Sequence, residues 1–98
     1  MLFLTGRLRL IHDETLAIGS VASVEIHPRT VLAKALEANA TKLLLVNNHP
    51  TGDPAPSRED EQLTARIRDA GRVMDVEVID HIVIAETGHA SLRSLGLM

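Results

Sequence analysis

The chain has 98 residues, 45% of them apolar and 23% charged, which is enough for one globular domain and too few for two. Its net charge of −3 and its single aromatic residue argue against autonomous nucleic-acid binding, which draws on phosphate contacts and base stacking. It has no cysteine and no apolar run near the roughly 20 residues of a membrane span, so we expect a cytoplasmic domain without disulfides.

Short strands are expected in the N-terminal quarter. Residues 2–4 are apolar, and Thr5-Gly6 is typical of a turn. Residues 7–12 alternate polar and apolar side chains, which indicates a half-buried strand. Further strands are predicted at residues 15–18 and 21–26, so the chain opens as a meander.

Two helices are predicted after this meander. Pro28 suits a first helical position, since its missing N–H would be unpaired there anyway, and Asn39 and Thr41 are expected to end this helix. The second helix is predicted over residues 57–73, where Ser57 and Asp60 have the spacing of a capping box. Its buried face is expected to carry four apolar residues, Leu63, Ile67, Ala70 and Met74.

Strands are predicted to alternate with these helices. Residues 42–46 form the most apolar run, and residues 75–86 are rich in β-branched side chains, which favour strands. Residues 87–89 are expected to turn, and Ser91 is expected to cap a last helical turn that ends at Gly96. The pattern predicts a mixed sheet with two main helices.

Between the apolar strand and the second helix lies a polar loop, NNHPTGDPAPSRED, from Asn47 to Asp60. His49, Ser57 and Asp60 could converge here, and His with Asp can hold Zn²⁺. From spacing alone, however, a helix cap is the favoured interpretation of Ser57 and Asp60, and Asp53 fits turn chemistry. His81, on an apolar strand, is expected to be a hydrogen-bonded core residue rather than a ligand.

The wider run resembles the signature H-x-H-P-S-G-D-x-x-P-S-x-x-D of the RadC-like JAB/MPN domains. Segments 26–29, 78–84 and 91–97 resemble other parts of that family, so the resemblance covers residues 1–98 as a single domain. It implies an α/β (α+β) fold, a cytidine-deaminase-like sandwich in which two main helices flank a mixed sheet. The helix-hairpin-helix region that precedes this domain in full-length relatives is absent from the sequence.

The resemblance also implies a JAMM zinc site, in which two His and one Asp bind Zn²⁺, a Glu acts as general base and a Ser stabilises the oxyanion. By position, His49 and Asp60 are metal ligands and Ser57 is the catalytic Ser. The first His falls on Asn47, and an amide is a poor zinc ligand. The family's base Glu would lie before the first residue here, which leaves Glu14 as the nearest substitute.

We therefore expect a RadC-like domain with an impaired JAMM site, weak or absent zinc, and a role in binding a protein or peptide partner. The alternative is an active zinc-dependent hydrolase of metallopeptidase or isopeptidase type. A third interpretation is a truncated or engineered fragment of an active enzyme, altered at Asn47. Exposed sheet edges could also pair two copies into a homodimer.

Overall fold

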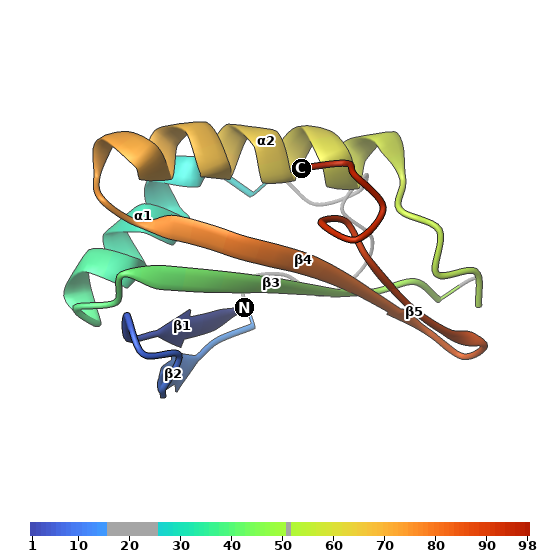
Figure 1. Ribbon diagram of the computed structural model, residues 1–98, viewed down its shortest axis with the longest axis horizontal. Coiled ribbons are helices and arrows are strands. Elements are labelled where there is room, and N and C mark those ends of the chain that lie inside the picture. The colour runs from blue at the N-terminus through green and yellow to red at the C-terminus, as the bar shows by residue number, and fades with distance from the viewer. Residues whose placement is uncertain (16–25, 51) are drawn as a thin grey trace.

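A five-stranded mixed sheet and two helices make up the fold in the computed structural model, which describes residues 1–15, 26–50 and 52–98 (Figure 1). The strand order is β2-β1-β3-β4-β5, in which β3 and β4 run parallel and the other neighbours are antiparallel. This confirms the predicted fold class. The elements are β1 (Leu2–Leu4), β2 (Leu10–Asp13), α1 (Pro28–Glu37), β3 (Lys42–Asn48), α2 (Arg58–Val73), β4 (Glu77–Ala85) and β5 (Gly88–Ser91).

Both helices pack on one face of the sheet. In β3, Leu43 and Leu45 are buried whereas Val46 is 39% exposed, as the two-residue repeat of a strand requires. The buried side chains of β3 join residues of α1 and α2 in one apolar cluster, and α2 lies along the sheet in Figure 1. Its main members are Phe3, Val31, Leu32, Ala35, Leu43, Leu45, Leu63, Ile67 and Val78.

The predicted helix starts are confirmed. Pro28 is the first residue of α1. At α2, the Ser57 hydroxyl accepts the Asp60 N–H at 3.1 Å, and the Asp60 carboxylate accepts the Ser57 N–H at 2.8 Å. This reciprocal cap satisfies two N–H groups that a helix start leaves unpaired, and it fixes where the chain enters α2.

Both helices end on a left-handed residue that is not glycine. Asn39 and Asp75 each have φ of 56°. Asn and Asp tolerate this conformation because their short polar side chains bond locally. Behind Asp75, the Val76 N–H reaches back to the Gly71 carbonyl at 2.8 Å. Asn39 therefore ends α1 as predicted, whereas the prediction that the late strand starts at residue 75 is wrong, because Asp75 belongs to the helix end.

Three other sequence predictions need correction. The strand predicted at residues 7–12 is β2, Leu10–Asp13, an edge strand whose four residues are all exposed rather than half-buried. β3 continues through Asn47 and Asn48, so the polar loop begins at His49. Met74 is 43% exposed, since it follows the last residue of α2.

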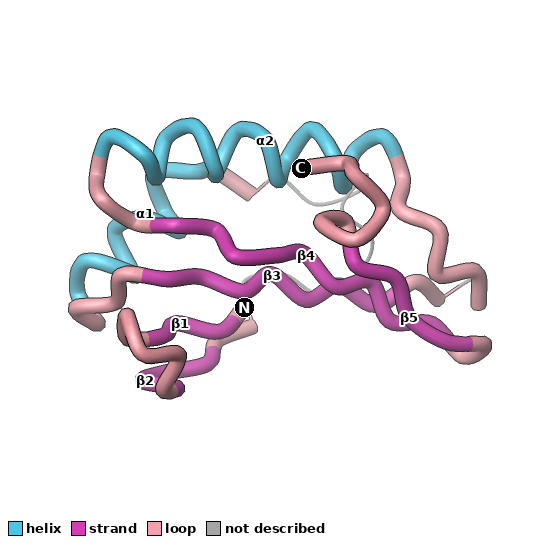
Figure 2. Tube along the Cα trace, viewed as in Figure 1, coloured by secondary structure: helices cyan, strands magenta, loops and turns pink. Residues whose placement is uncertain are grey.

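The C-terminal part also differs from its prediction. Residues 88–91, expected partly as a turn, form β5, which pairs with the end of β4 in the hairpin seen in Figure 2. Ser91 does cap a helical turn as predicted, because its hydroxyl accepts the Ser94 N–H at 3.0 Å. Residues 21–25 of the strand predicted at 21–26, and residues 16–18 of that predicted at 15–18, lie outside the described residues.

Within residues 1–15, 26–50 and 52–98, no helix is both long and apolar enough to cross a membrane.

Gly71 tests how tightly the end of α2 packs on the chain that follows it. A Cβ at this position would lie 2.4 Å from the Val76 carbonyl oxygen, a backbone atom that cannot swing away. We expect Gly71→Ala to lower the free energy of unfolding by about 1–3 kcal/mol in urea titrations, despite the roughly 1 kcal/mol by which Ala is the better helix former. The control is Gln62→Ala, at an exposed position of α2. Equal or greater stability of Gly71→Ala would contradict this packing.

Candidate functional site

The candidate site is built around one buried carboxylate, that of Asp60, which has 0% exposure. Its Oδ1 accepts the Asn47 amide N–H at 2.8 Å. Its Oδ2 accepts the Ser57 N–H at 2.8 Å and lies 2.9 Å from Nε2 of His49. The structure thus brings together four residues that the sequence singled out, Asn47, His49, Ser57 and Asp60. We call them the Asp60 cluster.

Three neighbouring segments supply the Asp60 cluster. Asn47 lies near the end of β3, and the His49 N–H bonds to the Ile84 carbonyl at 2.9 Å, which extends the β3–β4 ladder to the start of the loop. Ser57 and Asp60 lie at the N-terminus of α2, where the helix dipole favours negative charge. A strand end therefore faces a helix start across the polar loop.

His49 lies between two acceptors. Its Nε2 faces the Asp60 carboxylate, and its Nδ1 is 3.0 Å from the backbone carbonyl of Asp53. Neither oxygen can donate, so both contacts are hydrogen bonds only when both ring nitrogens carry a proton. No pattern in the sequence indicates that Asp53 contacts His49 through its carbonyl. The Asp53 side chain accepts the Ala55 N–H at 3.0 Å, which is the turn chemistry expected of it.

Asp60 is ionised at neutral pH. Burial favours the neutral acid, but hydrogen bonds from the backbone and side chain of Ser57 and from His49 outweigh it. The pKa of Asp60 therefore lies below its ordinary value of 3.8.

A second polar layer, which the sequence analysis missed, supports Asp60 from below. The Thr64 hydroxyl donates to the Asp60 backbone carbonyl at 2.7 Å and lies 2.6 Å from Nδ1 of His81. Since a hydroxyl has one proton, Nδ1 of His81 is the donor in the second bond. His81 is 2% exposed, and burial lowers its pKa below 6.5, so the prediction of a hydrogen-bonded core His is confirmed. The available signal was the position of Thr64, one turn after Asp60.

Glu14, the substitute base, makes its contacts elsewhere. Its carboxylate forms an ion pair with Lys34 of α1 at 2.7 Å and lies 3.6 Å from Nε2 of His12. The hydrogen bond from Lys34 is the main reason that the pKa of Glu14 is lowered. Glu14 is therefore an ion-paired carboxylate in this arrangement, and it takes no part in the hydrogen bonds of the Asp60 cluster described above.

The cluster does not fit a catalytic zinc ion. Such sites commonly use three protein ligands and keep a fourth position for water. His49 and Asp60 supply two, whereas Asn47 directs an N–H donor at Asp60, and an amide oxygen suits harder ions. Among the described residues, no three His, Cys, Asp or Glu side chains are placed to hold a metal ion.

Comparisons with known proteins agree on one family. Residues 1–97 match the RadC-like JAB domain. A UPF0758 protein of Syntrophomonas wolfei is 40% identical over 98 residues, which cover 100% of this chain and 42% of the relative. A UPF0758 protein of Bacillus licheniformis is 41% identical over 96 residues, covering 98% of this chain and 43% of the relative. The chain thus spans about two fifths of the length of these relatives.

Replacing the buried carboxylate tests its role in folding. Asp60→Asn keeps the size of the side chain but turns an NH₂ group toward donors, so we expect it to lower the free energy of unfolding at pH 7 by about 1–3 kcal/mol. Because the folded-state pKa is depressed, the contribution of Asp60 is present above the unfolded value of 3.8 and is lost as pH falls below it. The deficit of the variant should therefore shrink in acid.

The measurement is urea unfolding of both proteins in EDTA from pH 7 to pH 3. Asp69→Asn, at a position of α2 that is 63% exposed, is the control and should change stability little at any pH. A deficit of Asp60→Asn that stayed constant down to pH 3 would show that the ionised form of Asp60 does not stabilise the fold.

Proposed function

Because the chain belongs to the RadC-like JAB domain family, we propose that it is a metal-free member that serves as a cytoplasmic binding domain for a protein or peptide partner. The observation that carries this proposal is the 2.8 Å hydrogen bond from the Asn47 amide to the Asp60 carboxylate. A histidine at this position would be a third zinc ligand, whereas the amide is a donor.

The hydrogen bonds to Asp60 compensate its buried negative charge, as a metal ion would otherwise do. An unpaired carboxylate would be costly at 0% exposure, but Asp60 has donors from Asn47, His49 and Ser57. Even changes outside the ligands typically reduce metal affinity about 10–100-fold, so the loss of a ligand should cost at least as much.

The sheet face away from the helices favours a binding role. Val46 of β3 is 39% exposed and Ile84 of β4 is 42% exposed, and the two strands are neighbours in the sheet. Together these two aliphatic side chains give this face a small apolar surface for a partner to cover.

The competing proposal is a zinc-dependent hydrolase of metallopeptidase or isopeptidase type. The observation in its favour is that His49 and Asp60 face each other at 2.9 Å, so two of the three ligands of such a site are already adjacent. Such an enzyme would also need a base, and Glu14 would have to give up its ion pair with Lys34.

Zinc content separates the two proposals. The wild-type protein, purified without added metal, should hold far less than one zinc per chain by elemental analysis. Asn47→His should bind zinc near one per chain, because it supplies a third ligand beside His49 and Asp60. The same substitution at the next residue, Asn48→His, is the matched control, since adjacent residues of a strand point to opposite faces.

Wild-type protein with zinc near one per chain would contradict the proposal. The hydrolase would then be tested by peptide cleavage with the zinc-loaded protein, with Asp60→Ala as the inactive reference. Zinc uptake by both histidine variants would mean that the added imidazole binds metal without the Asp60 cluster.

A further inference from the structure

The strand β2 exposes aliphatic side chains at an edge of the sheet. In Figure 1 it is the outermost strand, on the far side of β1 from β3. Leu8, just before the strand, is 59% exposed, and Leu10 and Ile11 within it are 57% and 40% exposed. These side chains lie outside the apolar core, so a ligand can contact them without disturbing it.

The backbone of β2 leaves hydrogen-bonding groups open along this edge. Met1 and Glu14 exchange two bonds across the β1–β2 pair, at 3.0 and 3.1 Å. Because bonded and non-bonded pairs alternate in an antiparallel ladder, the next residue, Asp13, directs its N–H and C=O away from β1. Leu10 does the same, since its partner Leu4 turns its carbonyl to the other side, where it accepts a backbone N–H at 3.1 Å. In the described part of the chain no strand lies beyond β2, and such an edge can pair with an added strand.

Positive charge without a counter-charge lies beside the start of β2. Arg7 and Arg9 are both exposed, and among the residues that the structure describes neither forms an ion pair. The acidic residues at the other end of the strand are already engaged. Glu14 pairs with Lys34 at 2.7 Å, and Asp13 acts electrostatically on the N-terminal amino group. We call Arg7 and Arg9 the basic end of β2.

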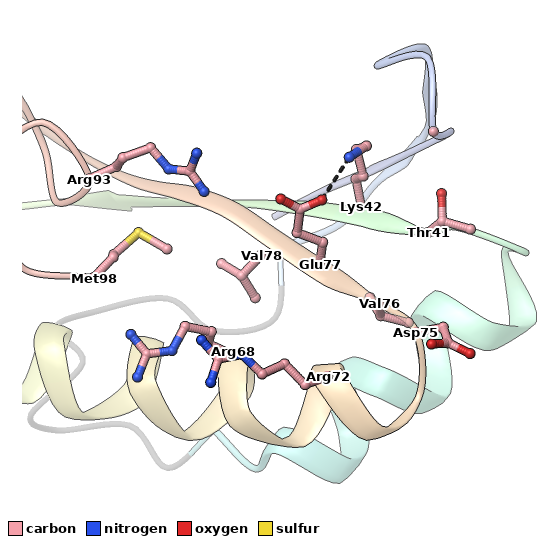
Figure 3. Close-up of a pocket in the computed structure, with 11 residues that line it drawn as sticks. Thr41, Lys42, Arg68, Arg72, Asp75, Val76, Glu77, Val78, Arg93 and Met98 are labelled. Carbon is pink, nitrogen blue, oxygen red and sulfur yellow. Dashed lines mark hydrogen bonds and ion pairs between the residues drawn. The ribbon is translucent and has the colours of Figure 1, made fainter.

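Other cations of the fold have carboxylates at hand. Lys42 pairs with Glu77 at 2.7 Å, as Figure 3 shows. Arg68 and Arg72 lie 3.4 and 3.8 Å from the carboxylate of Asp69. The concave surface that these three cations line is therefore balanced by the protein itself, whereas the basic end of β2 is not.

We propose that β2 binds an extended acidic peptide as an added antiparallel strand. Aliphatic side chains of the peptide cover Leu8, Leu10 and Ile11, and carboxylates near its C-terminal end pair with the basic end of β2. The direction follows from charge, because an antiparallel strand finishes beside the start of β2 and begins beside the acidic residues at the other end. The proposal rests on the binding role proposed above and gives it a place in the fold and a class of ligand.

The same observations disfavour two other occupants of the edge. Two copies paired through β2 would bring their basic ends together, while their acidic residues are already engaged. Ile11 lies between the paired residues Leu10 and His12 with no partner in β1, and such a bulge adds local twist. A flexible peptide can follow this twist, whereas a second sheet edge has to match it. Single-stranded nucleic acid is held largely by aromatic stacking, and the one aromatic residue, Phe3, is fully buried.

The test is fluorescence anisotropy in EDTA with the complete chain and a short labelled peptide. Valines of this peptide alternate with threonines in its first half and with glutamates in its second half. We expect saturable binding that is about three- to tenfold weaker for Arg7→Ala/Arg9→Ala, since exposed ion pairs each contribute modestly. The matched control is Arg29→Ala/Arg66→Ala, which removes the same charge from exposed positions of α1 and α2 and should change affinity less than about twofold.

Two changes to the peptide test its strand pairing and its direction. N-methylation of one alternate set of its residues should abolish binding, whereas N-methylation of the other set should have little effect, since only every second N–H of an added strand faces β2. The reversed sequence, with the same composition, should bind about threefold more weakly or worse, because its glutamates then meet the acidic end of β2.

NMR shift changes locate the bound peptide. They should centre on residues 10–13 and spare β5, the other edge of the sheet. The absence of saturable binding, equal losses in the two double variants, or equal binding of the reversed peptide or of an oligothymidylate would overturn the proposal. So would dimerisation of the free chain that added peptide does not reverse. Shift changes centred on Val46 and Ile84 would overturn it while leaving the broader binding role intact.

Discussion

A buried carboxylate is the constraint on which this structure depends. Asp60 has 0% exposure at the start of α2, and an ionised acid in that position is tolerable only if donors surround it. The donors come from β3, from the loop and from the helix cap. The hydrogen bonds to this one carboxylate therefore fix the end of β3, the loop and the start of α2 relative to one another.

The same constraint is met in this structure by hydrogen bonds from protein groups alone. A zinc ion and an amide N–H can both compensate a carboxylate, but only the metal ion offers an open position for water. With Asn47 as a donor, the carboxylate of Asp60 is compensated by hydrogen bonds from the protein itself. Beneath it, Thr64 and His81 continue the hydrogen bonding into the core, so Asp60 is fixed from two sides.

The sequence predicted best those features that depend on a few neighbouring residues. Pro28 at a helix start and the capping box of Ser57 and Asp60 are local, and both are as expected. The convergence of His49 on Asp60 was also expected, because a strand end and a helix start joined by one loop meet in space. The mixed sheet followed from the order of apolar runs.

Features set by distant partners could not be predicted in this way. β5 is a strand because it pairs with the edge of β4, although Gly88 has a weak strand propensity. β2 lies at the edge of the sheet with all four of its residues exposed, which its alternating pattern does not encode. Thr64 and His81 are 17 residues apart in the chain, so their contact depends on the packing of α2 on β4.

The strand order also bears on which elements form first during folding. β3, α2 and β4 follow one another from Lys42 to Ala85 and form a unit within one stretch of chain. β1 reaches the other edge of β3 only by closing a long loop, with Leu2 opposite Leu44. Because loop closure costs entropy that grows with loop length, we expect the β3–α2–β4 unit to form before β1 and β2 dock. Until β1 pairs with β3, the edge of β3 can pair with a strand of another chain. Aggregation during refolding should therefore depend on how fast β1 and β2 dock.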